Sequence, residues 1–267
     1  DYDFILRCTE LTARVGHVPR ILYHWRVHSN STADNPLSKM YAYEAGQRAL
    51  QEHLDRLNQP GEVSQLPHFG FYRVKYPVAG APLVSILIPN KDQADTLARC
   101  IASLQKSSWQ NYEIIIIENN SQQEETFAYY RELCGVCRQE GTGSIYCEGV
   151  LPGGQHVAVT VWEGIFNYSA INNFGAKHAR GEYYVLLNND IEIITEGWME
   201  EMLGNCQRPG VGVVGARLYY PDNTYQHAGI VVGIDGIAAN MFPGLRRGQE
   251  GYYHKAAIQL NYSAVTA

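Results

Sequence analysis

Three apolar segments of the sequence each end in a cluster of amide, carboxylate or lysine side chains. Residues 83–88, 113–117 and 183–187 are dominated by β-branched, leucine and aromatic residues. Short continuous runs of this kind are typical of strands that are buried on both faces of a sheet. Because ligands bind outside the carboxyl ends of the strands in an open parallel sheet, we expect the three polar clusters to line a single crevice.

Helical patterns separate the predicted strands. Residues 97–104 carry apolar side chains at helical spacing, and Asp92 is positioned to cap that helix. We expect Ser169 to cap a later helix that reaches Ala179, and residues 211–215 to form a further buried strand. Strands that alternate with helices predict an α/β fold with a mostly parallel central sheet flanked by helices.

The composition excludes several classes of protein. The 267 residues are 45% hydrophobic, which allows a substantial core, and 21 basic against 27 acidic residues give a net charge of −6. No basic block could follow a phosphate backbone, so nucleic acid is not an expected partner. No run approaches the ~20 apolar residues of a transmembrane segment. Six cysteines are too sparse for a disulfide scaffold, which favours a cytoplasmic location.

The sequence divides into three parts. Residues 1–58 are expected to end in a long helix that starts near Pro36, and residues 59–81, with several prolines and glycines, are expected to be a linker. Residues 82–267 carry the α/β pattern. The chain starts at Asp1 rather than at a methionine, so we expect it to belong to a longer protein.

The clusters at the strand ends carry side chains suited to a nucleotide diphosphate. A carboxylate such as Asp190 beside amide oxygens is a suitable ligand set for Mg²⁺ or Mn²⁺ carrying a phosphate. Glu118 could accept hydrogen bonds from ribose hydroxyls, and Asn90 and Asn120 could bind a planar base. Lys177 would add positive charge if its helix faces the crevice. Taken singly, each of these residues also fits an ordinary polar turn.

Four segments, in this order, resemble the family 2 glycosyltransferases of GT-A fold. They are residues 84–92, 111–121, 173–181 and 187–190. Three further segments resemble the bacterial polysaccharide members of that family. They are residues 212–218, 226–229 and 263–267. The resemblance extends over residues 82–267 and implies a Rossmann-like fold that binds a nucleotide-diphosphate sugar.

The resemblance implies an inverting transferase that uses a nucleotide-diphosphate sugar together with Mg²⁺ or Mn²⁺. The UDP- or dTDP-linked donor would be bound by Pro89, Asn90, Asp92, Glu118, Asn120, Asn173, Lys177, Asn188 and Asn189. Asp190 would hold the metal, although Asn188 replaces the first aspartate of the family's Asp-x-Asp signature, and His227 would lie on the acceptor side. The acceptor would be a glycan or a lipid-linked molecule, which would allow peripheral association with the inner membrane.

Residues 1–33 resemble the acceptor-side part of the same family. Asp1 matches the general base of a Glu-Asp-x-Asp-x-x-x-Arg motif. His28 matches a histidine that can approach the metal or the diphosphate, although it fits a surface histidine equally well. These segments precede the donor-binding half, which reverses the order of a single transferase. The chain would then be a slice of a tandem protein, or a permuted single domain.

Two other functions are compatible with parts of this pattern. The chain could be a non-catalytic module that binds a nucleotide sugar or holds a neighbouring synthase domain. A dinucleotide-dependent enzyme is disfavoured, because no Gly-x-Gly-x-x-Gly pattern follows the first strand of the α/β region.

Overall fold

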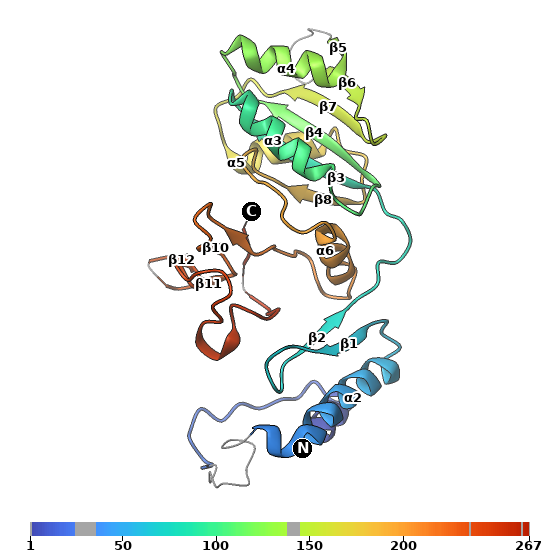
Figure 1. The fold of residues 1–267 in the computed structure, drawn as a ribbon, viewed down its shortest axis with the longest axis vertical. Coiled ribbons are helices and arrows are strands. Elements are labelled where there is room, and N and C mark those ends of the chain that lie inside the picture. Colours follow the sequence, from blue (N-terminus) through green and yellow to red (C-terminus); the bar gives the residue numbers. More distant parts are fainter. Residues whose placement is uncertain (1, 25–35, 138–144, 235, 263, 267) are drawn as a thin grey trace. The chain divides into compact units, whose positions relative to one another are not determined.

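The computed structural model describes residues 2–24, 36–137, 145–234, 236–262 and 264–266. The chain divides into two compact units. Unit 1 comprises Asp1–Pro77 and Tyr219–Ser263, and unit 2 comprises Val78–Leu218 and Ala264–Ala267. Figure 1 shows the helices and strands of both units along the chain.

Unit 2 is built on a six-stranded sheet. In spatial order its strands are β5 (Val136–Cys137), β6 (Ile145–Val150), β7 (His156–Val161), β4 (Tyr112–Glu118), β3 (Val84–Asn90) and β8 (Tyr183–Leu186). The last four are parallel, whereas β5 and β6 pair antiparallel at one edge. The predicted α/β fold with a mostly parallel sheet is therefore confirmed.

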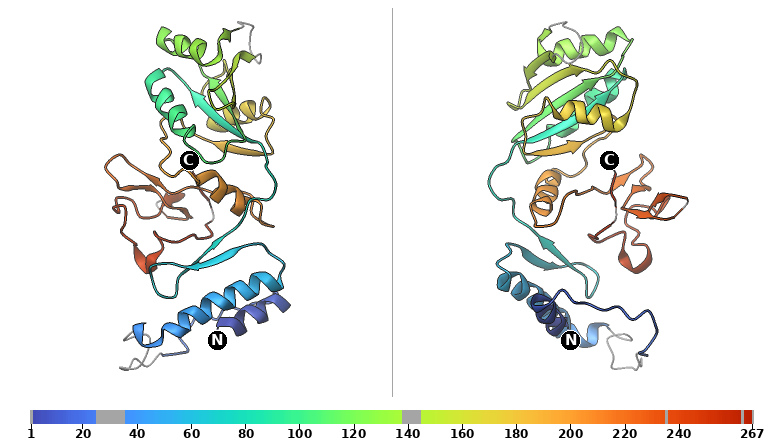
Figure 2. Two further views of the ribbon diagram at one scale, coloured as in Figure 1. Left: turned by 45° about the vertical axis from the view of Figure 1, so that its right-hand side comes forward. Right: turned by 180° about the vertical axis from the view of Figure 1, so that it is seen from behind.

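Helices cover both faces of this sheet. Side chains of α3 (Ala94–Leu104), α4 (Glu124–Cys134) and α6 (Trp198–Cys206) join one apolar cluster with the strands, and α5 (Tyr168–Ala176) joins a second. Figure 2 shows α5 in front of the sheet when the molecule is seen from behind. Strand β4 supplies Ile114 and Ile116 to the first cluster and Ile115 and Ile117 to the second, each at most 1% exposed. Each such buried side chain stabilises the fold by about 1.5–3 kcal/mol.

Two strand predictions require correction. The sequence predicts β8 as buried on both faces, but it is the edge strand of the sheet, and Tyr184 and Leu186 are 52% and 41% exposed. Residues 211–215, predicted to form a buried strand, form none, and Val213 is 73% exposed. A short apolar run does not reveal how many neighbouring strands will flank it, because tertiary pairing decides that.

The helix starts of unit 2 also differ from the predictions. Asp92 does not cap α3; its Oδ1 instead accepts hydrogen bonds of 2.7 and 2.9 Å from the backbone N–H groups of residues 122–123, at the start of α4. Asn167, rather than Ser169, caps α5, with its Oδ1 accepting a 2.9 Å bond from the backbone N–H three residues later. The path of each loop determines which capable side chain reaches a helix end.

The described part of unit 1 contains two α-helices, two short 3-10 helices and short antiparallel strands. α1 (Tyr2–Leu11) contacts α2 (Met40–Arg56), which follows the short helix η1 (Pro36–Lys39). β1 (Glu62–Gln65) and β2 (Tyr72–Lys75) form a hairpin within the segment predicted to be a linker. The later elements are β9 (Leu218–Tyr219), β10 (Tyr225–His227), β11 (Ile230–Val232), β12 (Ala238–Asn240) and η2 (Tyr252–His254). Among the described residues, no helix has both the length and the apolar character needed to cross a membrane.

The two units do not coincide with the predicted parts of the sequence. Residues 219–263 belong to unit 1, together with the N-terminal segment, although the sequence pattern assigns them to the part that spans residues 82–267. The predicted long helix is present and ends at Arg56, close to the expected end at residue 58. The origin of the chain as a slice of a tandem protein stays a prediction.

Candidate functional site

A pocket lies at the carboxyl ends of the parallel strands of unit 2. Its volume is about 320 Å³, within the range that is usual for ligand sites. Five residues predicted to bind the donor or the metal line it, namely Pro89, Asn90, Asn188, Asn189 and Asp190. The lining also includes Lys91, Gln93, Asn119, Phe166 and Tyr168. The three predicted clusters and the loop after β7 thus contribute to one site.

A series of hydrogen bonds links the strand ends to one another. The register of β3 on β4 places Asn90 opposite Glu118. Asn189 Nδ2 donates to Asn90 Oδ1 (2.7 Å), and Asn90 Nδ2 donates to the Tyr130 hydroxyl (2.8 Å). Tyr130 donates in turn to Glu118 Oε2 (2.7 Å). Tyr130 of α4 therefore connects the ends of β3 and β4, and Asn90 connects them to the loop after β8.

Glu118 belongs to this network and is absent from the pocket lining. It is 4% exposed, and its carboxylate also accepts bonds from the Ser121 backbone N–H (2.5 Å) and hydroxyl (2.6 Å). Burial and then the charge of Glu118 raise the pKa of Tyr130 well above its usual value, so the phenol remains protonated and donates. Binding of a ribose hydroxyl by Glu118 stays a prediction, since both carboxylate oxygens already accept hydrogen bonds within the protein.

The loop after β8 carries Asp190. Of the described residues that line the pocket, Asp190 is the one with a carboxylate side chain. The pairing of β8 with β3 continues to a 3.0 Å bond from the Leu187 N–H to the Leu87 carbonyl, after which the chain leaves the sheet. Asp190 is exposed. Burial first, and then the charges of Asp190 and Glu192, raise the pKa of the Cys100 thiol to about 12. Cys100 therefore stays neutral.

The residues around Asp190 fit a hard divalent cation. Carboxylate and amide oxygens are the ligands that Mg²⁺ and Mn²⁺ prefer. The Asn189 amide is oriented because its Nδ2 donates to Asn90, which leaves its Oδ1 for another partner. Asn188 also lines the pocket, but an amide there brings less negative charge than the aspartate of the family signature. One carboxylate with two neutral amides would hold such a cation more weakly than two carboxylates would.

A further part of the wall comes from the loop after β7. Asn119 Nδ2 donates to the carbonyls of Trp162 (3.2 Å) and Gly164 (3.1 Å), which anchors the loop that carries Phe166 and leads to Tyr168, the first residue of α5. These two pocket residues are 62% and 40% exposed, so their rings are accessible to a ligand. The sequence-based prediction missed them because it did not identify β7 as a parallel neighbour of β4. A fourth parallel strand would have predicted a fourth loop at this edge.

Five other residues predicted to bind the donor lie in unit 2 but not in the pocket lining. Glu118 is one of them. Asp92 is bonded to the start of α4, and Asn120 Nδ2 donates to the Gly164 carbonyl (3.2 Å), so both hold loops at the edge of the sheet. Asn173 is exposed on α5, and Lys177 is exposed at its end. The pocket therefore does not bring Asn173 and Lys177 together with the strand ends.

His227, the residue predicted for the acceptor side, belongs to unit 1. His227 is 1% exposed, and its Nδ1 lies 2.7 Å from Asn240 Oδ1, so its side chain is held within that unit. Asp1 and His28 lie outside the described residues. The roles of all three stay predictions.

Comparison with known proteins identifies the family. The sequence pattern described as glycosyl transferase family 2 matches residues 85–232. The chain belongs to this family. Family membership and the mostly parallel sheet together confirm the expected GT-A fold.

Several longer proteins are similar to this family 2 chain. The uncharacterized protein y4gI of Sinorhizobium fredii is 38% identical over 274 residues, which cover 100% of this chain and 28% of that protein. The O-antigen biosynthesis protein RfbC of Myxococcus xanthus is 38% identical over 242 residues, which cover 90% of this chain and 17% of that protein. The chain thus spans less than a third of the length of either relative.

Among solved structures, the mannosyltransferase PcManGT from Pyrobaculum calidifontis, in complex with GDP-Man and Mn²⁺, is similar to this chain. The two are 12% identical with a TM-score of 0.42, over 69% of this chain and 46% of that one. A likeness of this degree is too slight to support conclusions about the ligands of the family 2 chain.

Proposed function

We propose that the pocket of unit 2 binds a nucleotide-diphosphate sugar with Mg²⁺ or Mn²⁺, as the donor site of an inverting glycosyltransferase. The observation that carries this proposal is the convergence of Asn90, Asn189 and Asp190 with the rings of Phe166 and Tyr168 in one pocket. A diphosphate with a cation requires oxygen ligands, and a base requires flat apolar surface beside groups that form hydrogen bonds. The pocket lining offers both.

Asp190, with the amide oxygens of Asn188 and Asn189, would hold the cation. When bound, a divalent cation neutralises the charge of the departing diphosphate. Lys91 lines the same pocket and is exposed, so its ammonium group is available to a second phosphate oxygen. The hydrogen bond from Asn189 to Asn90 keeps the amide of Asn189 in one orientation before the ligand arrives, which lowers the ordering cost of binding.

Phe166 and Tyr168 would contact the base, and the donor would be UDP- or dTDP-linked. Aromatic rings bury a planar base at low conformational cost because each has only two side-chain torsions. The amide of Gln93, in the same lining, can donate to and accept from the edge of a base, whereas Asn119 can only accept, through Oδ1, because its Nδ2 already donates to two carbonyls. This assignment replaces Asn120, which bonds to Gly164, as the amide closest to the base.

The sugar would pass with inversion to a glycan or lipid-linked acceptor. In such a direct displacement, a carboxylate removes the proton of the acceptor hydroxyl as that oxygen attacks the sugar carbon. We assign this role to Asp1, on the sequence resemblance alone. The similarity to an O-antigen biosynthesis protein supports a role in polysaccharide assembly, in the cytoplasm or at the cytoplasmic face of the membrane.

A second candidate function is donor binding without transfer, within a larger polysaccharide-synthesis protein. Asp190 is the sole carboxylate among the described pocket-lining residues, which favours binding over turnover. A transfer assay with the whole protein, alongside nucleotide binding by this chain, distinguishes the two functions. Binding without transfer of any tested sugar would favour the second.

Calorimetry with UDP in the presence of Mn²⁺ tests the proposed site. Asp190→Ala should remove the metal-dependent part of UDP binding, because the remaining oxygen ligands are neutral amides. Asp95→Ala is the matched control, since Asp95 is an exposed aspartate in the first turn of α3. Equal metal-dependent affinities for UDP in the wild type and the Asp190 variant would show that the cation binds elsewhere.

A further inference from the structure

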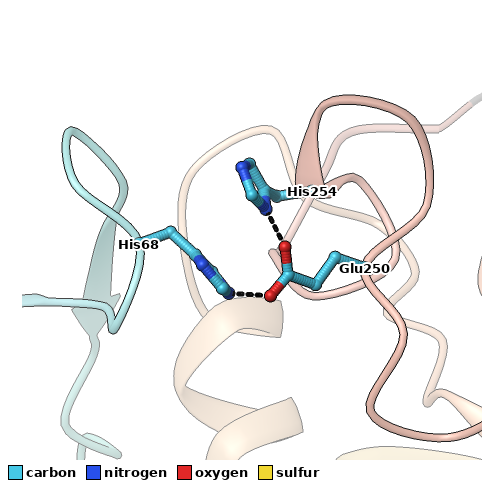
Figure 3. A group of neighbouring side chains, drawn as sticks. All are labelled: His68, Glu250 and His254. Atoms are coloured by element: carbon cyan, nitrogen blue, oxygen red, sulfur yellow. Dashed lines mark hydrogen bonds and ion pairs between the residues drawn. The ribbon is translucent and has the colours of Figure 1, made fainter. Parts of the chain in front are cut away.

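Unit 1 contains a cluster of metal-ligating side chains that is separate from the residues of the unit 2 pocket. His68 lies in the loop between β1 and β2, whereas Glu250 precedes η2 and His254 is the last residue of η2 (Figure 3). One ligand atom from each residue lies within 4.8 Å of the other two. Residues distant in sequence thus place two imidazole nitrogens and a carboxylate oxygen around one point.

The carboxylate of Glu250 lies between the two imidazoles. Glu250 Oε1 is 2.8 Å from His68 Nε2, and Oε2 contacts His254 Nδ1. The imidazole rings are stacked, with centroids 4.3 Å apart and an angle of 19° between their planes. Both histidines therefore direct a ring nitrogen towards the same carboxylate, as Figure 3 shows.

The backbone around the cluster is held in place on both sides. The hairpin loop is closed by a 2.9 Å bond from the Leu66 N–H to the Phe71 carbonyl, and the ring of Phe71 packs edge-on against His254 at 4.8 Å. On the other side, the buried Tyr225 hydroxyl donates to the Ala256 carbonyl (3.2 Å). Ligands on anchored segments lose little entropy when they bind an ion.

The backbone conformation at His254 is also uncommon for its residue type. Tyr253 and His254 have φ angles of +52° and +55°, in the left-handed region that favours glycine. Such conformations cost on the order of 1–3 kcal/mol and are concentrated at functional sites. In this segment they direct His254 Nδ1 to Glu250, only four residues earlier, in a turn that is not α-helical.

The chemistry of the three ligands favours zinc. Two histidines and one glutamate form a recognised Zn²⁺ ligand set, with water in the fourth position, whereas Mg²⁺ prefers oxygen ligands alone. The side chains of His68, Glu250 and His254 are 26%, 37% and 35% exposed, so an ion and its water can reach them. We propose that these three residues bind one Zn²⁺ ion, which ties the β1–β2 hairpin to the segment of residues 219–263.

Zinc binding by the metal-free chain tests this proposal directly. After dialysis against a chelator, titration with Zn²⁺ should give one ion per chain and raise the melting temperature, because an ion that binds only the folded state stabilises it. Mg²⁺ at the same concentration should not raise it. X-ray absorption at the zinc edge should show two imidazole ligands.

His68→Gln separates metal binding from the hydrogen bond. The glutamine amide can still donate to Glu250, but it is a poor zinc ligand, so we expect at least a tenfold loss of Zn²⁺ affinity with the fold retained. His17→Gln, at an exposed position, is the control and should bind zinc like the wild type. Asp190→Ala should also retain zinc binding, so failure of one proposal leaves the other intact. Unchanged affinity in His68→Gln, or no binding by the wild type, would identify a hydrogen-bonded trio without a metal.

Discussion

Tyr130→Phe is the most informative substitution in the hydrogen-bond network of unit 2. The ring of Tyr130 is fully buried, and phenylalanine preserves its packing while removing the hydroxyl. That hydroxyl donates to the Glu118 carboxylate (2.7 Å) and accepts from Asn90 Nδ2 (2.8 Å). The substitution therefore removes one charge-assisted and one neutral hydrogen bond in a buried environment.

The size of the effect follows from the bonds that remain. Glu118 keeps its two bonds from Ser121, and Asn90 Nδ2 keeps the Asp92 carbonyl (3.0 Å). No buried group loses every partner, so we expect a loss of about 2–3 kcal/mol in the free energy of unfolding, the upper part of the range for a bond to a charged group. Asn90 and Asn189 should also become less well ordered, which would weaken UDP binding several-fold.

Urea unfolding followed by tryptophan fluorescence measures this loss, because three of the four tryptophans, Trp109, Trp162 and Trp198, lie in unit 2. Tyr129→Phe on the same helix is the matched control, since Tyr129 is only partly buried and lies outside the network. We expect the control to change the free energy of unfolding by no more than about 0.5 kcal/mol. A similarly small change for Tyr130→Phe would refute the view that this hydroxyl fixes the strand ends.

Two further predictions concern the opposite end of the sheet. Burial alone would raise the pKa of Glu113, but hydrogen bonds from Ser85 and Arg180 outweigh it and hold the pKa below its usual 4.5. The ionised Glu113 carboxylate therefore stabilises the fold above pH 4.5, and this stabilisation is lost as the pH falls through the pKa that Glu113 has in the folded state. Arg180→Ala should therefore lower the free energy of unfolding by about 1–3 kcal/mol at neutral pH, and its difference from the wild type should shrink in acid. A difference in the free energy of unfolding that is the same at all pH values would contradict this prediction. Gly181→Ala would place a Cβ atom 2.7 Å from the Leu83 carbonyl oxygen and should lower the free energy of unfolding by about 1–3 kcal/mol. The control is Gly197→Ala, whose Cβ atom would meet Ser108 Oγ at 3.7 Å and which should leave the free energy of urea unfolding nearly unchanged.

The sequence predicted the centre of the sheet because burial on two faces leaves a clear pattern. Strands β3 and β4 are almost entirely buried, so their residues form continuous apolar runs, and polar residues follow where the strands end. Parallel pairing then places those ends at one edge, which is why Asn90, Asn189 and Asp190 were predicted to lie together. This inference required no knowledge of the loops.

The remaining features depend on contacts that no local pattern encodes. The helical spacing of α4 predicts only that Tyr130 lies on its apolar face. The fold shows that the Tyr130 hydroxyl reaches Glu118. Phe166 follows a strand whose direction the sequence did not reveal. His68 and Glu250 meet only because residues 219–263 pack with the N-terminal segment in unit 1. Each case requires knowing which segments lie side by side in the folded chain.

We propose the carboxyl edge of this sheet as a donor site organised around Asp190. The most direct test of this proposal is anomalous diffraction at the manganese edge from crystals of the chain grown with UDP and Mn²⁺. We predict a manganese peak beside the Asp190 carboxylate, with the diphosphate on the ion and the uracil against Phe166 or Tyr168. A nucleotide bound with its manganese away from Asp190 would show that this carboxylate does not hold the cation.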